Sequence, residues 1–164
     1  MPVHAERRVM PWSPAQLYAL VADIGRYPEF LPWCIAARIH RREPVAAGEI
    51  VWADLVVGFR MVREKFTSKV TLTPQRPDGV PHIDVEYVDG PLRHLRNHWL
   101  FVPLPDGSTE IDFHVEFEFR SKILEKLIGA LFHEAITRMV AAFERRALAL
   151  YGAPGGAGTA PATR

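Results

Sequence analysis

The sequence has a single cysteine, Cys34, among its 164 residues. One cysteine excludes an internal disulfide and a cysteine-rich zinc site. A lone cysteine outside any recognisable reactive motif is typically a small packed hydrophobe, so we do not expect it to be a nucleophile.

The chain has almost no net charge, with 20 lysines and arginines against 19 aspartates and glutamates. This balance gives no global electrostatic reason to expect nucleic-acid binding, and no DNA partner is predicted. No apolar run approaches the roughly 20 residues that span a bilayer, and the first residues lack the apolar core of a signal peptide. We therefore expect a cytoplasmic protein whose membrane contact is at most peripheral, at the inner face of the cytoplasmic membrane.

Metal-binding motifs are also missing. His94 and His98 lie in a predicted strand, where four residues span roughly 13 Å, too far for both imidazoles to bind one zinc ion. His133 begins a pattern similar to the zincin motif, but Thr137 stands where the second histidine would be. No metal ligand is predicted.

Candidate nucleophiles are present without their usual surroundings. Cys34, Ser68 and Ser121 occur in no nucleophile elbow or active-cysteine context. The acidic residues Asp112 and Glu116 lie on a strand face that we expect to be solvated. No catalytic residue is predicted from these patterns.

A strand with strict alternation is predicted over residues 111–119, which read IDFHVEFEF. Successive side chains of a strand point to opposite faces, so the odd residues form one apolar face and the even residues one polar face. We expect the odd face to be buried.

A long helix is predicted next, from Ser121 to Tyr151, without a proline. Its apolar residues form two adjacent rows, a wider sector than a coiled-coil seam needs. Ser121 is a candidate N-cap and Gly152 a candidate C′ residue. A single helix of this length would run roughly 45 Å. The rows could be ordinary core or the wall of a cavity.

The rest of the chain predicts one strand, two short helices and a series of strands. A strand over residues 4–9 precedes a helix with Ser13 as N-cap, which Gly25 ends, and an aromatic helical turn over residues 27–33. Further strands are predicted over residues 36–43, 49–57, 61–73, 82–88 and 92–102. The fold class is α+β, with six to seven antiparallel strands curved around the C-terminal helix. We expect one domain over residues 1–152 and a disordered tail over residues 153–164.

Two polar residues occur among apolar neighbours in the predicted strands. Asn97 shares its strand face with Leu95 and Trp99, and Trp52 needs a partner for its indole N–H if it is buried. An unpaired buried polar group costs about 1 to 3 kcal/mol. Either the protein or a ligand therefore satisfies these groups.

Six short stretches, in order along the chain, resemble the coenzyme Q-binding START-like family, which includes mitochondrial proteins and bacterial relatives called ribosome association toxins. They are ERR at 6–8, YPEFLPWC at 27–34, DGPL at 89–92, WLFVP at 99–103, FEFRS at 117–121 and AFERRA at 142–147.

The resemblance implies a helix-grip fold with a deep apolar cavity between the sheet and the C-terminal helix. It further implies that the cavity holds ubiquinone or a similar isoprenoid lipid as a bound ligand, without catalysis and without a required cofactor. Such a protein would support respiratory electron transport or quinone biosynthesis as a carrier or chaperone. An isoprenoid tail offers only apolar surface, worth about 25 cal/mol per Å² buried.

We expect the ligand to contact residues of the aromatic turn, the strands and the C-terminal helix. The candidates are Phe30, Leu31, Trp33, Trp52, Arg63, Phe66, Asn97, Trp99, Val115, Phe117, Leu124, Leu127, Leu131, Phe132, Ala135 and Met139. Among them Trp52, Arg63 and Asn97 are candidate donors to the head-group carbonyls.

Two other functions stay open. The name of the bacterial relatives suggests binding to the large ribosomal subunit and a block of subunit association, through a basic surface formed by Arg60, Arg63, Lys65, Lys69, Arg93 and Arg96. A cyclase or hydrolase on the same fold is the third alternative, because one fold hosts many functions.

Overall fold

The structure is a computed structural model that describes residues 3–59, 62–129 and 131–153. The predicted disorder of the tail falls on residues outside this range, apart from Ala153. The elements are β1 (Val3–Met10), α1 (Pro14–Ala22), the 3₁₀ helix η1 (Ile24–Glu29), β2 (Cys34–Val45), β3 (Gly48–Phe59), β4 (Val62–Thr73), β5 (His82–Asp89), β6 (Leu92–Pro103), β7 (Thr109–Phe119), α2 (Lys122–Gly129) and α3 (Phe132–Tyr151).

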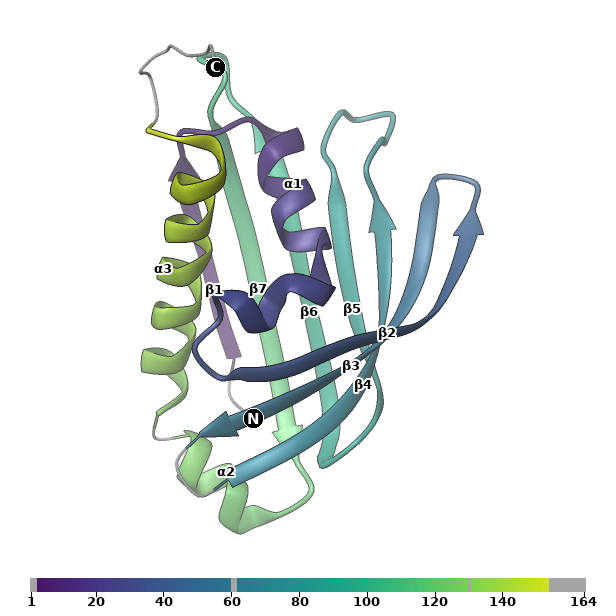
Figure 1. The fold of residues 1–164 in the computed structure, drawn as a ribbon, viewed down its shortest axis with the longest axis vertical. Helices are drawn as coiled ribbons and strands as arrows, with labels where there is room; N and C mark the ends of the chain where they lie inside the picture. The colour runs from purple at the N-terminus through teal and green to yellow at the C-terminus, as the bar shows by residue number, and fades with distance from the viewer. Residues whose placement is uncertain (1–2, 60–61, 130, 154–164) are drawn as a thin grey trace.

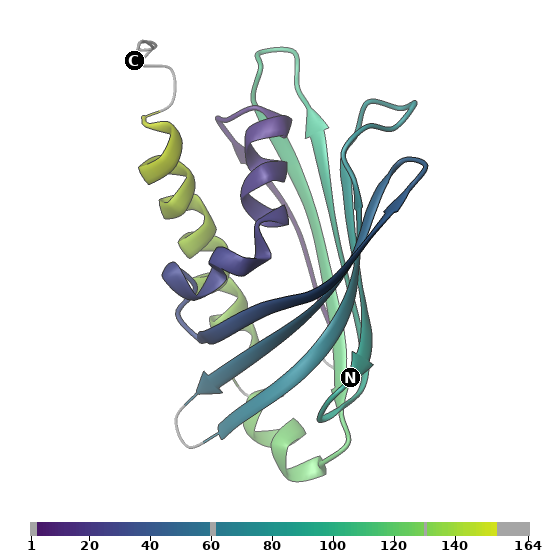
Figure 2. The ribbon, with the colours of Figure 1, turned by 45° about the vertical axis from the view of Figure 1, so that its right-hand side comes forward.

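The strands form one antiparallel sheet of seven, in the order β1-β7-β6-β5-β4-β3-β2. The sheet is strongly curved, and its concave side faces α1, η1 and α3 (Figures 1 and 2). This is the predicted α+β helix-grip fold, and every predicted strand is present. None of the helices in the described part of the chain is long and apolar enough to cross a bilayer.

Strand β7 alternates as predicted. Residues 109, 111, 113, 115 and 117 are buried, whereas the even residues between them are only partly covered. The buried residues point to the concave side of the sheet, and the partly covered ones lie on the convex side. The period-two pattern therefore fixes which side of the sheet carries the core.

The prediction of one continuous C-terminal helix is wrong. The segment forms two helices, α2 and α3, and the amide of Leu131 bonds the carbonyl of Ile128 between them. Gly129, at the end of α2, is a poor helix former. The predicted caps are confirmed, because the Ser121 hydroxyl accepts from the amide of Leu124 and Gly152 has a positive φ of 81°. With 20 residues, α3 runs only about 30 Å.

Helix α1 begins with the predicted N-cap. Ser13 and Gln16 form a capping box, in which each side chain bonds the backbone amide of the other, and Pro14 occupies the first turn. Gly25 does not end this helix as predicted. Asp23 is its last cap, and Gly25 lies inside η1.

The C-terminal end of α3 is bonded to the N-terminal region (Figure 1). The indole Nε1 of Trp12 donates to the carbonyl of Gly152 over 3.1 Å, and the Tyr151 hydroxyl donates to the carbonyl of Gln16 over 2.8 Å. Thr109 in β7 donates its hydroxyl to the carbonyl of Trp12. These bonds join α1, α3 and the sheet at one end of the molecule.

Candidate functional site

A cavity of about 250 Å³ lies between η1, α3 and the concave face of the sheet. We call it the η1 chamber. Its lining is Val21, Ile24, Tyr27, Leu31, Pro32, Trp33, Cys34, Ala53, Leu55, Val57, Phe66, Ser68, Val70, Ile83, Val85, Leu95, Asn97, Trp99, Phe113, Val115, Ile136, Met139 and Phe143. Nearly all of these side chains are apolar, and none is acidic or basic.

A second cavity of about 290 Å³, the α2 chamber, lies toward the start of α3 and the end of α2. Its lining is Trp33, Val57, Gly58, Glu64, Phe66, Pro91, Leu92, Leu95, Val115, Phe117, Phe119, Ile128, Leu131, Phe132, Glu134, Ala135 and Ile136. Six residues line both chambers, namely Trp33, Val57, Phe66, Leu95, Val115 and Ile136. The chambers are therefore neighbours along one apolar cavity.

Most of the predicted ligand contacts line this cavity. The residues that do so are Leu31, Trp33, Phe66, Asn97, Trp99, Val115, Phe117, Leu131, Phe132, Ala135 and Met139. The structure thus brings together residues from the segment after η1, from the three strands β4, β6 and β7, and from α3 with its N-cap. That a ligand contacts them stays a prediction.

Two predicted contacts, Trp52 and Arg63, lie on the opposite side of the sheet. In β3 the odd residues Ala53 and Leu55 line the cavity, so Trp52 faces outward, where the guanidinium of Arg41 stacks 4.4 Å from its ring centroid. In β4 the even residues face inward, so Arg63 is exposed on the convex side. Neither can donate to a head group inside the cavity.

Three further candidates lie beside the cavity without lining it. Phe30 packs its ring 5.3 Å from that of Phe143 and lies beneath the guanidinium of Arg146. Leu124 and Leu127 are in α2, which has no buried residue, and Leu127 is 44% exposed. Neither position lines either chamber.

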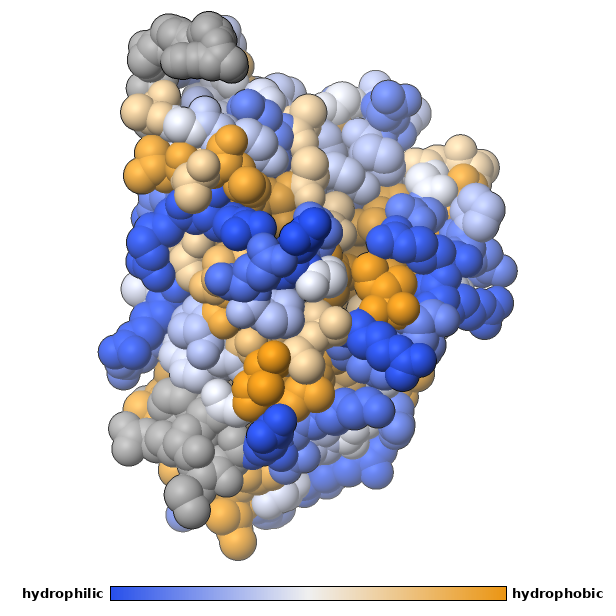
Figure 3. All heavy atoms as spheres, in the orientation of Figure 1, coloured by the Kyte–Doolittle hydropathy of each residue, from blue (hydrophilic) through white to orange (hydrophobic). Residues whose placement is uncertain are grey.

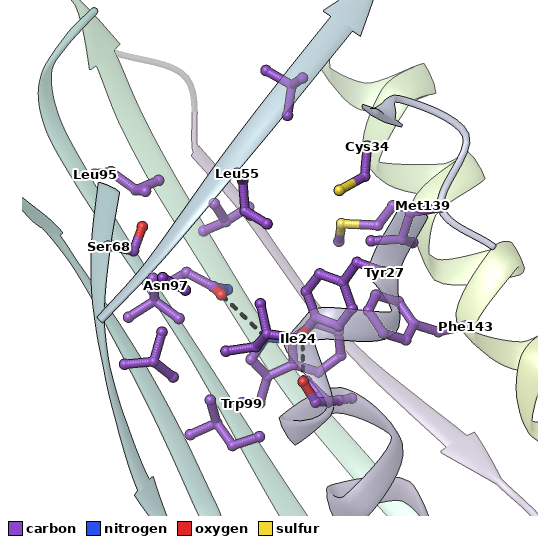
Figure 4. A pocket seen from close by; sticks show the side chains of 18 of the residues that line it. Ile24, Tyr27, Cys34, Leu55, Ser68, Leu95, Asn97, Trp99, Met139 and Phe143 are labelled. Atoms are coloured by element: carbon purple, nitrogen blue, oxygen red, sulfur yellow. Dashed lines mark hydrogen bonds between the residues drawn. The ribbon is translucent and has the colours of Figure 1, made fainter. Parts of the chain in front are cut away.

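Asn97 is the polar centre of the η1 chamber (Figure 4). Its Oδ1 accepts from the indole Nε1 of Trp99 over 3.0 Å, and its Nδ2 donates to the carbonyl of His114 over 2.8 Å. The protein therefore satisfies one amide hydrogen and the amide oxygen. The second amide hydrogen has no acceptor among the described residues.

Ser68 is a polar wall residue that the sequence analysis considered only as a nucleophile. It is 3% exposed, lies opposite Ala53 and Tyr87 in the sheet, and its Oγ has no hydrogen-bond partner in the described structure. A signal for it exists, because Ser68 interrupts the inward alternation of Phe66, Val70 and Leu72 in β4.

The other polar groups of the η1 chamber are neutral. The Tyr27 hydroxyl donates to the carbonyl of Val21, and burial raises the pKa of Tyr27. Burial also raises the pKa of the Cys34 thiol to about 11, so the thiol keeps its proton near neutral pH. No acid or base lines this chamber among the described residues, so nothing there could activate Ser68 or Cys34 as a nucleophile.

The predicted basic surface is a face of mixed charge. Lys65 lies 3.8 Å from Asp54, and Arg93 lies 4.0 Å from Glu118. Arg96 is placed opposite Glu116 in the sheet register. Arg60 lies outside the described residues. The alternation of charges on the convex side leaves no uniformly basic patch across these strands.

Comparison with known proteins shows the family to which the chain belongs. The family model for polyketide cyclase/dehydrase and lipid transport matches residues 10–144. The chain belongs to this START-like family. The 18 kDa protein CC1736 from Caulobacter crescentus, a solved structure, is similar over 93% of this chain and all of its own, with 37% identity and a TM-score of 0.75.

Curated relatives carry two kinds of name. The ribosome association toxin RatA of Rickettsia prowazekii is 39% identical over 85% of this chain and 92% of its own length. RatA of Escherichia coli K12 is 35% identical over 93% of this chain and 91% of its own. The coenzyme Q-binding protein COQ10 homolog B of Xenopus laevis is 33% identical over 91% of this chain and 59% of its own. These matches confirm the resemblance that the short stretches indicated.

Proposed function

We propose that the protein binds ubiquinone or a similar isoprenoid lipid in the two-chamber cavity and acts in the cytoplasm as a carrier or chaperone, without catalysis. The observation that carries this proposal is the apolar lining of two adjacent cavities between the sheet and α3. Such a cavity suits a ligand that is long and almost wholly apolar. The printed name of the coenzyme Q-binding relative supports the choice of ubiquinone.

The chemistry of the cavity favours binding over catalysis. Hydrolysis or cyclisation needs a group that takes or gives a proton, and the side chains of the η1 chamber are neutral. Of the two glutamates in the lining of the α2 chamber, Glu134 is exposed and paired with Arg138, which leaves Glu64 without a second acid or a nucleophile beside it in that lining. A bound lipid would therefore be held and released unchanged.

Extraction of the protein after expression in a ubiquinone-producing bacterium tests the proposal. Mass spectrometry of the organic extract should show ubiquinone in near-stoichiometric amount. The same purification from a strain that makes no ubiquinone controls for carry-over of bulk lipid. An extract of the first preparation without any isoprenoid lipid would contradict the proposal.

Exchange of the lipid with a membrane would involve α2. Ile123 is 80% exposed on this helix beside Leu127, and Lys122 and Lys126 lie on the same short segment. In Figure 3 apolar atoms lie at the bottom edge of the view, where α2 is placed. An apolar face with flanking lysines suits peripheral contact with an anionic membrane. Ile123→Ser should weaken sedimentation with phosphatidylserine vesicles, whereas Val9→Ser, at a 59% exposed site on β1, should not.

Binding to the large ribosomal subunit is the second candidate function. It is favoured by the names of relatives that match nearly their whole length at 35–39% identity. The mixed charge of the convex side predicts weak salt dependence for any contact made there. Co-sedimentation of the protein with purified large subunits at low salt would support this function. A protein that stays in the supernatant at low salt would contradict it.

A further inference from the structure

The two chambers differ in which hydrogen-bonding groups they offer. In the η1 chamber the hydroxyl of Ser68 and the second amide hydrogen of Asn97 have no hydrogen-bond partner among the described residues. The α2 chamber has Glu64 and Glu134 in its lining, and the carboxylate of Glu134 is paired with Arg138 at an exposed site. Ionised carboxylates accept hydrogen bonds and donate none, so they do not attract a carbonyl or ether oxygen.

Ser68 and Asn97 lie on the same wall of the sheet (Figure 4). Ser68 in β4 is opposite Tyr87 in β5, and Val85, two residues earlier in β5, is opposite Asn97 in β6. Both side chains thus lie on the concave face, with β5 between their two strands, so their backbones are about two strand spacings, roughly 10 Å, apart. Leu95 lies beside them in the same view.

The orientation of Asn97 is fixed by the protein. Its Oδ1 is held by the indole of Trp99 and one Nδ2 hydrogen by the carbonyl of His114, so the amide cannot flip without breaking both bonds. The free hydrogen is therefore presented as a donor. Ser68 adds an O–H donor that rotates about its staggered side-chain torsion.

The buried hydroxyl of Ser68 has no hydrogen-bond partner in the described structure. A buried hydroxyl without a partner is a departure from the rule that buried polar groups are hydrogen-bonded, and it stands in a wall where its neighbours are apolar. The hydroxyl of Tyr87, the residue opposite Ser68 in β5, accepts from the amide of Leu92, and it makes no bond to Ser68 in the described structure. A ligand head with more than one oxygen atom would offer each donor an acceptor.

We propose that Ser68 and Asn97 form the site that receives the oxygen-bearing head of the ligand, so that the head lies in the η1 chamber and the apolar tail runs into the α2 chamber. The site selects ligands that carry a carbonyl or ether oxygen at one end of an isoprenoid or alkyl chain. It rejects pure hydrocarbons, which leave both donors unpaired. This inference rests on the proposed function and adds its orientation and specificity.

Titration of the purified, delipidated protein with decylubiquinone and with hexadecane tests the inference, followed by tryptophan fluorescence or calorimetry. Ser68→Ala should weaken decylubiquinone binding about 3- to 10-fold and should strengthen hexadecane binding, because one of the two donors that hexadecane leaves unpaired is removed. Thr67→Val is the matched control, because it removes a hydroxyl from the neighbouring residue, whose side chain bonds Asp54 on the convex side. This control should bind both ligands as the wild type does.

Infrared spectra of bound decylubiquinone give a second measurement, because the carbonyl band reports hydrogen bonding to the ligand and does not depend on the stability of the protein. The hydrogen-bonded carbonyl band should shift upward in Ser68→Ala toward its position in an apolar solvent, and stay in place in Thr67→Val. Equal affinity and unchanged carbonyl bands in Ser68→Ala would overturn the head-group site while leaving quinone binding established. A wild type that binds no quinone would overturn the proposed function and this inference with it.

Discussion

The two chambers of the cavity share a sheet but are closed by different helical segments. The η1 chamber is covered by η1 and by the middle of α3, where the ring centroids of Trp99 and Phe143 lie 5.2 Å apart. The α2 chamber is bordered by the end of α2 and the first turn of α3, and there Phe117 lies 4.8 Å from Phe132. Both are walled by aromatic rings.

The difference lies in their polar groups. The lining of the η1 chamber has no acidic or basic residue and includes the donors of Ser68 and Asn97, whereas the lining of the α2 chamber includes two glutamates and borders a helix without buried residues. One cavity can therefore discriminate the two ends of an amphipathic ligand through the placement of a few atoms. Burial of apolar surface provides most of the affinity, and the hydrogen-bond donors determine which end of the ligand lies in which chamber.

The largest expected effect comes from a charge in the α2 chamber. Leu131→Arg places a guanidinium in the apolar lining, so lipid binding should fall about 30-fold or more. Leu148→Arg is the control, since Leu148 is 48% exposed on α3 and lines neither chamber. Retention of ubiquinone by folded Leu131→Arg, measured by extraction, would show that the tail does not occupy this chamber.

A smaller effect should follow from narrowing the same chamber without a charge. Ala135→Phe fills space that a long tail would use, so affinity for a long-chain ubiquinone should fall about tenfold while a tail-less quinone is little affected. Ala149→Phe, at an exposed site of α3, controls for the added ring. An equal loss for both ligands would contradict the division between head and tail.

The thiol of Cys34 reports on the η1 chamber. Burial raises its pKa to about 11, so alkylation should be slow near neutral pH and fast in the urea-unfolded chain. A tail-less quinone at five times its dissociation constant should slow alkylation of the folded protein about sixfold. Mass spectrometry follows the modification. Unchanged rates on saturation would place the head elsewhere.

The smallest effect concerns the convex side, outside both chambers. Hydrogen bonds from His114 and His94 hold the pKa of Glu116 below its ordinary value of 4.5. Because the folded pKa is the lower one, the stabilisation is present above about pH 4.5 and is lost as the pH falls through the folded value. Glu116→Gln should therefore flatten the decline of the unfolding midpoint in acid without changing lipid affinity. A parallel decline in both proteins would contradict this.

The fold was predictable because its patterns are local. The alternation of residues 111–119 assigned the buried face of β7, and Ser13 with Pro14 marked the start of α1. The break between α2 and α3 was not predictable from periodicity. Its apolar rows continue through Gly129, and only packing against the curved sheet decides where the helix stops.

The site was only partly predictable, because strand faces had to be assigned one by one. Trp52 shares its face with Asp54, and Arg63 shares its face with Lys65, so the charged neighbours already indicated that both point outward. Ser68 was missed because a serine among apolar residues reads first as a nucleophile. Its meaning depends on the absence of a partner for its hydroxyl, which only coordinates reveal.

The two ends of α3 are held by different kinds of contact. Hydrogen bonds of Trp12 and Tyr151 hold its last turn, whereas its first turn is held by the packing of Phe132 on Phe117 and by an exposed contact between His4 and His133. Hydrogen bonds restrict the last turn more tightly than ring contacts restrict the first. We therefore expect α3 to open more readily at the end that borders the α2 chamber, so that a tail would enter there while Ser68 and Asn97 stay in place.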